Sequence, residues 1–127
     1  MAERDTTVAV LADDLIWATR LVDAVRATGA APIRLRRASD FPGAAGQATG
    51  YAIVDLTARA YDGVEAIRVA RGLGLRVVAV GQHDDVELRH RAMEAGAERV
   101  FTYRQLFEQG RERLATWLAT PAAGAGG

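Results

Sequence analysis

The chain has 127 residues, of which 50% are hydrophobic and 25% charged, the size and composition of one soluble domain. Its 16 positive side chains are all arginine and it contains no cysteine, which excludes a P-loop lysine, a Schiff-base amine, a thiol nucleophile and a zinc–thiolate site. An equal number of acids balances the arginines, so no overall field favours nucleic acid or an anionic membrane as a partner.

Strand-like and helix-like segments alternate along the chain. Short apolar runs predict buried strands, and apolar residues at helical spacing predict helices. In chain order we expect a strand at 6–11, a helix at 15–28, a strand at 32–36, a short helix starting near residue 40, a strand at 51–56, a helix at 63–71, a strand at 76–80, a helix from 84 or 85 to about 95, a strand at 99–102 and a helix at 105–119. This alternation predicts an α/β fold with right-handed crossovers and a single parallel sheet covered by helices on both faces.

Two of the expected helices carry long apolar faces. The first is capped by Asp14 and ended by Gly29. Its expected inward side chains are Leu15, Ala18, Leu21, Val22 and Val25. Those of the last helix are Leu106, Phe107, Gly110, Leu114, Trp117 and Leu118. Both faces are wide enough to pack against a sheet.

The two ends of the chain carry little structural information. Residues 1–5 do not open a signal peptide, and no apolar run approaches the length of a membrane span, so we expect a cytoplasmic protein. Residues 1–119 are expected to form one domain. Residues 120–127, rich in glycine and alanine, are expected to form a disordered tail because they bury nothing that offsets the entropy of ordering.

Acidic residues follow two of the predicted strands. Asp13 and Asp14 come after the first strand, and Asp55 ends the strand at 51–56. Sites in open parallel sheets form outside the carboxyl ends of the strands, where a cation such as Mg²⁺ would offset the mutual repulsion of these carboxylates. Each acid alone also fits a structural role, with Asp14 as a helix cap, Asp13 in solvent and Asp55 at the start of a loop.

The spacing of these motifs resembles a known family. Residues 11–21 contain the acidic pair, residues 51–57 contain Asp55, and Asp62 and Gly63 follow seven and eight positions after it. An apolar strand at 77–81 and an Ala-Gly-Ala at 95–97 complete the pattern. Together they resemble the receiver domains of response regulators in two-component signalling, over about residues 6–119. The resemblance implies a flavodoxin-like, doubly wound sheet of order 2-1-3-4-5.

The resemblance also implies roles for individual residues. Asp55 aligns with the aspartate that accepts a phosphoryl group in a phosphorelay. Asp13 and Asp14 align with the pair that holds Mg²⁺, with the backbone carbonyl of Thr57 as a further ligand. A metal at this place would offset charge on both the carboxylate and the phosphoryl group.

Several positions depart from the family pattern. Gly81 replaces the switch threonine or serine, Val100 replaces the switch aromatic residue, and Tyr103 replaces the lysine that contacts the acyl phosphate. Ala58 and Arg59 stand where the family has Met-Pro. A tyrosine is uncharged at neutral pH, and glycine has no hydroxyl, so the switch is expected to be degenerate.

Other side chains near the acids leave alternatives open. Arg59, Arg104 and His83 lie in predicted loops, where they could replace the missing lysine or simply be solvated. Ile16 and Trp17 follow the acidic pair, where they either form an apolar lid or begin the packing of the helix.

Three functions are compatible with these residues and motifs. The first is an atypical, stand-alone receiver domain that a sensor histidine kinase phosphorylates on Asp55 and that acts by binding other proteins. The second is a phosphorylation-independent pseudo-receiver that docks another signalling protein, or a second copy of itself, through the face formed by residues 86–117. The third is a small Mg²⁺-dependent enzyme acting on a phosphate ester. Because no separate general base is visible, we expect no enzyme activity.

Overall fold

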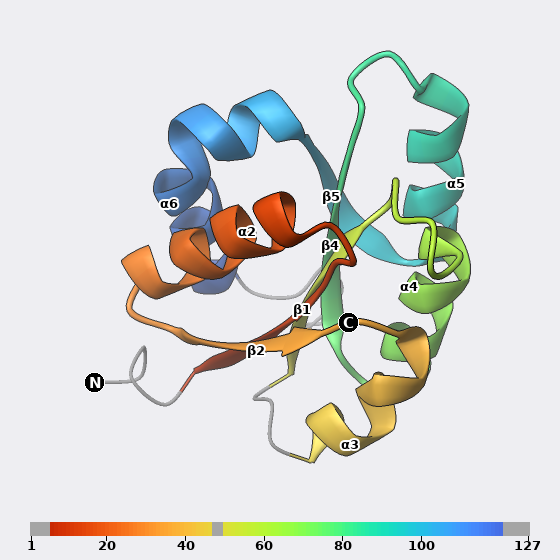
Figure 1. The fold of residues 1–127 in the computed structure, drawn as a ribbon, viewed down its shortest axis with the longest axis horizontal. Coiled ribbons are helices and arrows are strands. Elements are labelled where there is room, and N and C mark those ends of the chain that lie inside the picture. Colours follow the sequence, from red (N-terminus) through yellow and green to blue (C-terminus); the bar gives the residue numbers. More distant parts are fainter. Residues whose placement is uncertain (1–5, 47–49, 121–127) are drawn as a thin grey trace.

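The computed structural model describes residues 6–46 and 50–120 (Figure 1). Residues 1–5 of the predicted domain and residues 121–127 of the predicted tail lie outside the described residues. In the described part no helix combines the length and the hydrophobicity that a membrane span needs.

Five parallel strands form one sheet in the order β2-β1-β3-β4-β5. The strands are β1 (Thr7–Leu11), β2 (Ala31–Leu35), β3 (Tyr51–Asp55), β4 (Arg76–Gly81) and β5 (Ala97–Thr102). The helices are α2 (Leu15–Ala27), α3 (Phe41–Ala45), α4 (Gly63–Gly72), α5 (Val86–Ala95) and α6 (Tyr103–Ala119), with a 3-10 turn at Ala38–Asp40 before α3. The predicted α/β fold and strand order are confirmed.

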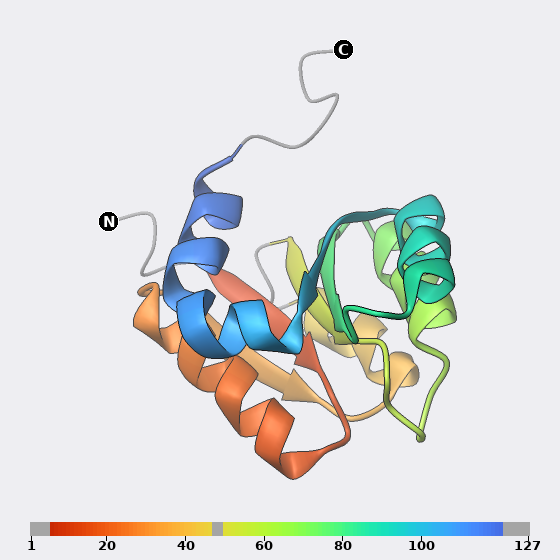
Figure 2. The same cartoon turned by 90° about the horizontal axis from the view of Figure 1, so that it is seen from above.

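Helices cover both faces of the sheet, as Figure 2 shows from above. Helices α2 and α6 lie on one face, and α3, α4 and α5 lie on the other. Alternate strand residues point to opposite faces. The α2/α6 side takes Val8, Val10, Ile53, Val78 and Val80, and the other side takes Ala9, Leu11, Ala52, Val54, Val77 and Ala79. Burial on both faces explains why the strands read as continuous apolar runs.

Side chains at the carboxyl ends of the strands start the helices. Asp14 accepts from the Trp17 N–H at 2.9 Å, and Asp85 accepts from the Leu88 N–H at 3.0 Å. Thr102 caps α6 in a reciprocal box with Gln105. These caps fix the loops that surround the carboxyl edge of the sheet.

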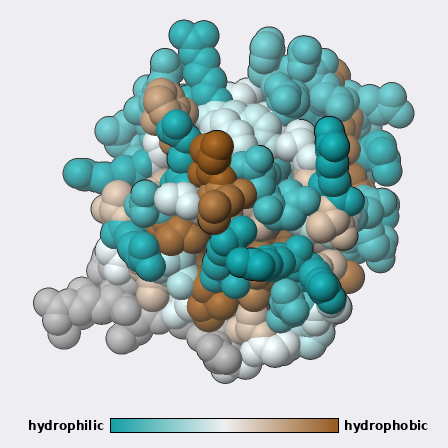
Figure 3. Space-filling model, viewed as in Figure 1, coloured by the Kyte–Doolittle hydropathy of each residue, from teal (hydrophilic) through white to brown (hydrophobic). Residues whose placement is uncertain are grey.

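Two inward-facing predictions were wrong. Leu15 is 66% exposed because it opens α2 at the rim, where the strands have already ended, and Figure 3 shows hydrophobic surface over α2. Phe107 is 62% exposed because α6 is not one continuous helix. Gln109 has non-helical angles (φ −136°, ψ 28°), and before this break Leu106 remains in the core with Leu114 and Trp117 while Phe107 does not.

A glycine lies at each end of α4, and the two differ in the space around them. A Cβ on Gly63 would lie 2.9 Å from the Leu56 Cα, whereas nothing lies within 4 Å of a Cβ on Gly72. We expect Gly63→Ala to lower the free energy of unfolding by about 1–3 kcal/mol because the backbone must shift. Gly72→Ala should instead raise it by about 0.5–1 kcal/mol through helix propensity. Urea unfolding of both variants checks this, and equal effects would contradict the packing argument.

An ion pair joins strands β4 and β5 near their amino ends. Arg76 donates to both carboxylate oxygens of Glu98 at 2.7 and 2.8 Å, and the two side chains are only 15% and 18% exposed. The Arg76 guanidinium also lies 5.4 Å from the centre of the Tyr51 ring. Hydrogen bonding to Arg76 lowers the pKa of Glu98 below its usual value. The pair therefore stabilises the fold only while Glu98 is ionised.

The pH dependence of stability follows from the sign of this shift. The contribution of Glu98 is complete above its unfolded pKa of about 4.3 and is lost as pH falls through the lower folded value. We expect Glu98→Gln to lower the free energy of unfolding by about 1–3 kcal/mol at neutral pH, and we expect the difference from wild type to disappear as pH falls through the lowered pKa of Glu98. Glu108→Gln removes the exposed pair with Arg104 and serves as control. A deficit of Glu98→Gln that persists unchanged in acid would contradict the assignment.

Candidate functional site

The acids predicted from the sequence line one cavity at the carboxyl edge of the sheet. This cavity has a volume of about 580 Å³. It is lined by Asp13, Asp14, Trp17, Asp55, Thr57, Arg59, Gln82 and Tyr103. The loops after β1, β3 and β4 and the first turns of α2 and α6 contribute, so residues far apart in sequence meet where parallel strands end.

Asp55 is the buried acid of this cavity. It ends β3, is 1% exposed, and is the one charged residue among the described ones that is fully buried. Its Oδ1 accepts from the Thr57 N–H at 3.1 Å and contacts the hydroxyls of Thr57 and Tyr103. Those two hydroxyls also contact each other. Two hydroxyl protons are thus shared among three oxygens, which offsets the cost of burying the carboxylate.

Asp13 and Asp14 are held by backbone amides. Asp13 Oδ2 accepts from the N–H groups of Arg59 and Ala60, both at 3.0 Å, and so ties the loop after β1 to the loop after β3. Asp14 Oδ1 caps α2. The structural role considered for Asp14 is therefore present, and the same side chain also lines the cavity.

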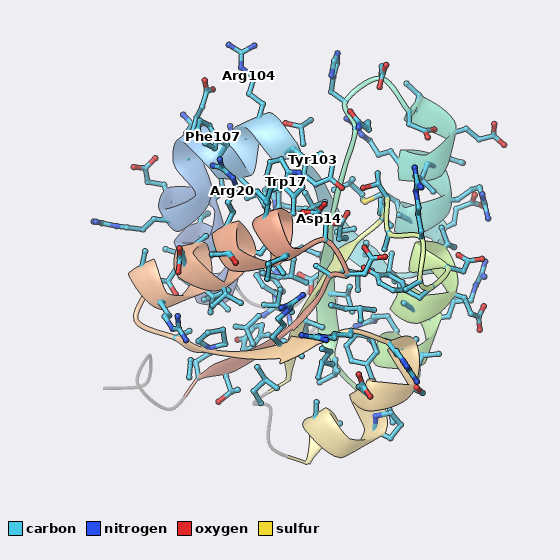
Figure 4. The ribbon with its side chains drawn as sticks, in the orientation of Figure 1. Asp14, Trp17, Arg20, Tyr103, Arg104 and Phe107 are labelled. Atoms are coloured by element: carbon cyan, nitrogen blue, oxygen red, sulfur yellow. The ribbon has the colours of Figure 1, made fainter. Side chains whose placement is uncertain are left out.

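Tyr103 reaches Asp55 from the start of α6. Its hydroxyl donates to Asp55 Oδ1, and its ring stacks on Trp17 with centroids 4.2 Å apart and a tilt of 37° (Figure 4). Burial, followed by the hydrogen bond to Asp55, raises the pKa of Tyr103 well above its ordinary value. Tyr103 is therefore a neutral donor where the resemblance expects a lysine. Trp17 lines the cavity, and its N–H lies in the capped first turn of α2, so it combines features of the two alternatives for it.

Tyr61 was missed by the sequence analysis. Its hydroxyl contacts the carbonyl oxygens of Leu11 and Asp55, at 2.9 and 2.7 Å, and so bridges the carboxyl ends of β1 and β3. Burial and the charges of Asp55 and Asp13 raise the pKa of Tyr61, which keeps the phenol protonated. The sequence carries no signal for this role beyond an aromatic residue in a polar loop.

The cations considered as replacements for lysine lie in different places. Arg59 lines the cavity. Arg104 is 84% exposed at its side chain and pairs with Glu108, and Figure 4 shows it pointing away from the cavity. His83 is exposed in the loop after β4 and does not line the cavity. Arg59 is thus the one of the three that a ligand in the cavity would meet.

The other two departures from the family pattern do not line the cavity. Gly81 ends β4, and a Cβ there would lie 3.3 Å from Leu56 Cδ1, so Leu56 takes up part of the space that a switch side chain would need. Val100 is half-buried in β5 and packs on the α4/α5 side of the core. Neither residue lines the cavity that contains Asp55.

The donor set matches Mg²⁺ in chemistry but does not form a closed site. Carboxylate and carbonyl oxygens from Asp13, Asp14, Asp55 and Thr57 are the ligands this hard ion prefers. Within residues 6–46 and 50–120, however, no three acidic or histidine side chains gather closely enough to hold a metal ion. The magnesium site stays a prediction, because side chains would have to move to complete it.

Comparisons with known proteins identify the fold. No protein-family model matches the chain, and no curated protein matches it. Among solved structures, a beryllofluoride-activated receiver domain of DrrB is 20% identical, with a TM-score of 0.76 over 91% of this chain and 98% of that one. A response regulator from Thermotoga maritima is 18% identical, with a TM-score of 0.73 over 91% and 98% of the two chains. A CheY-like response-regulator receiver protein from Methanospirillum hungatei JF-1 is also 18% identical, with a TM-score of 0.68 over 87% and 94%. The chain therefore has the fold of response-regulator receiver domains.

Proposed function

We propose that this chain is an atypical response-regulator receiver domain that acts in signal transduction by binding other proteins. The observation that carries the proposal is the position of Asp55, buried at the end of β3 in the cavity shared with Asp13, Asp14 and Thr57. The receiver domains among its structural neighbours support the same assignment. A cytoplasmic location and a lack of enzyme activity belong to this proposal.

In this proposal Asp55 is the acceptor of a phosphoryl group from a sensor histidine kinase. Among the described residues Oδ1 is the oxygen that takes the hydrogen bonds, which leaves Oδ2 to form the new P–O bond as the P–N bond of the phosphohistidine breaks. The Thr57 N–H holds the carboxylate in one orientation. A bound Mg²⁺, held by Asp13, Asp14, Asp55 and the Thr57 carbonyl, would supply charge neutralisation.

The missing lysine weakens the phosphorylated state. Tyr103 offers a hydrogen bond but no charge, and Arg59 is the cation at the cavity. With Gly81 and Val100 in place of the family's switch residues, an acyl phosphate at Asp55 has few ways to alter the α5–β5–α6 face. We therefore expect little structural change on phosphorylation.

The same contacts favour a second candidate, a pseudo-receiver that binds partners without phosphorylation. The Tyr103 hydroxyl hydrogen-bonds to Asp55, and backbone amides donate to Asp13 and Asp14, so each of the three acids already has a donor from the chain itself. The partner would be a signalling protein, or a second copy of this chain, on the face of α5, β5 and α6 that includes Met93 and Arg113.

Amide NMR spectra with Mg²⁺ alone, and with Mg²⁺ and beryllofluoride, test the proposed function. We expect Mg²⁺ to shift the amides around Asp13, Asp55 and Thr57, and beryllofluoride to add changes that stay near Asp55. Asp55→Asn should abolish the beryllofluoride response, and Asp23→Asn, on the exposed side of α2, should preserve it.

Two results would contradict parts of this picture. Large amide shifts throughout residues 97–119 on addition of beryllofluoride would show that the switch works, and would contradict the prediction of a degenerate switch. Spectra that respond to neither addition would contradict the receiver chemistry and leave the pseudo-receiver.

A further inference from the structure

A column of stacked side chains runs outward from Asp55 between α2 and α6. Tyr103 stacks on Trp17, the Arg20 guanidinium lies 5.6 Å from the Trp17 ring, and the same guanidinium lies 4.4 Å from the Phe107 ring. Figure 4 shows these four side chains gathered at the ends of the two helices next to Asp14. The spacings 17/20 and 103/107 place each pair on one helical face.

Tyr103 blocks the approach to Asp55 in this arrangement. Its hydroxyl contacts both Asp55 Oδ1 and Thr57 Oγ1, and its ring lies between these groups and Trp17. Asp55 is 1% exposed although it faces a cavity large enough for a tetrahedral oxyanion. The Tyr103 side chain thus covers Oδ1 of Asp55 at the inner end of the cavity.

The backbone of Tyr103 is held in place, whereas its side chain borders the cavity. The reciprocal box between Thr102 and Gln105 holds the first turn of α6. The ring itself is half-buried and borders the open part of the cavity. Opening therefore needs a rotamer change at one residue, which breaks the contacts to Asp55, Thr57 and Trp17 together.

We propose that Tyr103 and Trp17 form a gate over Asp55, so that a small phosphoryl-like ligand bonds Asp55 only after Tyr103 rotates out of the cavity and leaves its stack on Trp17. The nature of the ligand rests on the proposed function, whereas the gate rests on the contacts around Tyr103.

The first arm of the test measures how fast Asp55 is labelled by phosphoramidate in the presence of Mg²⁺. In this reaction an Asp55 oxygen forms a bond to phosphorus while the P–N bond breaks. The electron pair of the P–N bond stays on nitrogen, which leaves as ammonia. Intact-mass spectrometry follows the product. We expect Tyr103→Ala to raise the labelling rate about tenfold, equivalent to ~1.4 kcal/mol of stabilisation of the closed gate. Tyr103→Phe, which keeps the ring and loses the hydroxyl, should be labelled at a rate between those of wild type and Tyr103→Ala. Arg104→Ala should be labelled at the wild-type rate.

The second arm watches the gate without any reaction. Fluorine NMR of protein carrying fluorotryptophan gives one resonance for Trp17 and one for Trp117. Trp117 packs edge-on against Tyr51 at a centroid distance of 5.3 Å, which makes it a matched Trp–Tyr pair away from the cavity. We expect Mg²⁺ with beryllofluoride to shift the Trp17 resonance toward its position in Tyr103→Ala, while Trp117 stays in place and reports that the variant is folded.

The outcomes separate the gate from the proposed function. Equal labelling of wild type and Tyr103→Ala, with an unmoved Trp17 resonance, would overturn the gate and leave Asp55 as acceptor. Slower labelling of Tyr103→Ala would also overturn it and make Tyr103 a positioning residue. If neither protein is labelled and neither responds to beryllofluoride, both the gate and the proposed function fail.

Discussion

Asp55 places a carboxylate where solvent reaches only 1% of its surface, and the rest of the pocket is arranged around that charge. A buried carboxylate is tolerated only if donors replace the water it has lost. Here the donors come from the residue two positions on, Thr57, and from Tyr103 at the start of α6. The end of β3, the following loop and α6 are therefore bound to each other through one side chain.

The neighbouring groups extend the same constraint to the other loops. Asp13 takes two amides from the loop after β3, and Tyr61 joins the ends of β1 and β3 through two carbonyl oxygens. These contacts hold the acids in place with neutral donors. Each acid therefore has a hydrogen-bond donor within the chain, as both the atypical receiver and the pseudo-receiver require.

Much of the fold could be predicted from the sequence because strands that are buried on both faces of the sheet are continuous apolar runs. The apolar runs located every strand, and Asp14 and Asp85 marked two helix starts. The prediction for Phe107 was wrong because helical periodicity assumes an unbroken helix, whereas α6 is interrupted at Gln109, directly before Gly110. The rule that sites form at strand ends brought the acids to one cavity, but it fixes no side-chain rotamer. The contact of Tyr103 with Asp55 and the bridge made by Tyr61 therefore needed the structure.

The interruption at Gln109 divides α6 into two mechanical units. The second unit is anchored by Leu114 and Trp117, which are almost fully buried. The first is anchored by Leu106 and by the box between Thr102 and Gln105, and it carries Tyr103 and the exposed Phe107. The rotation that opens the gate therefore takes place in one unit, while the packing of Trp117 on Tyr51 belongs to the other.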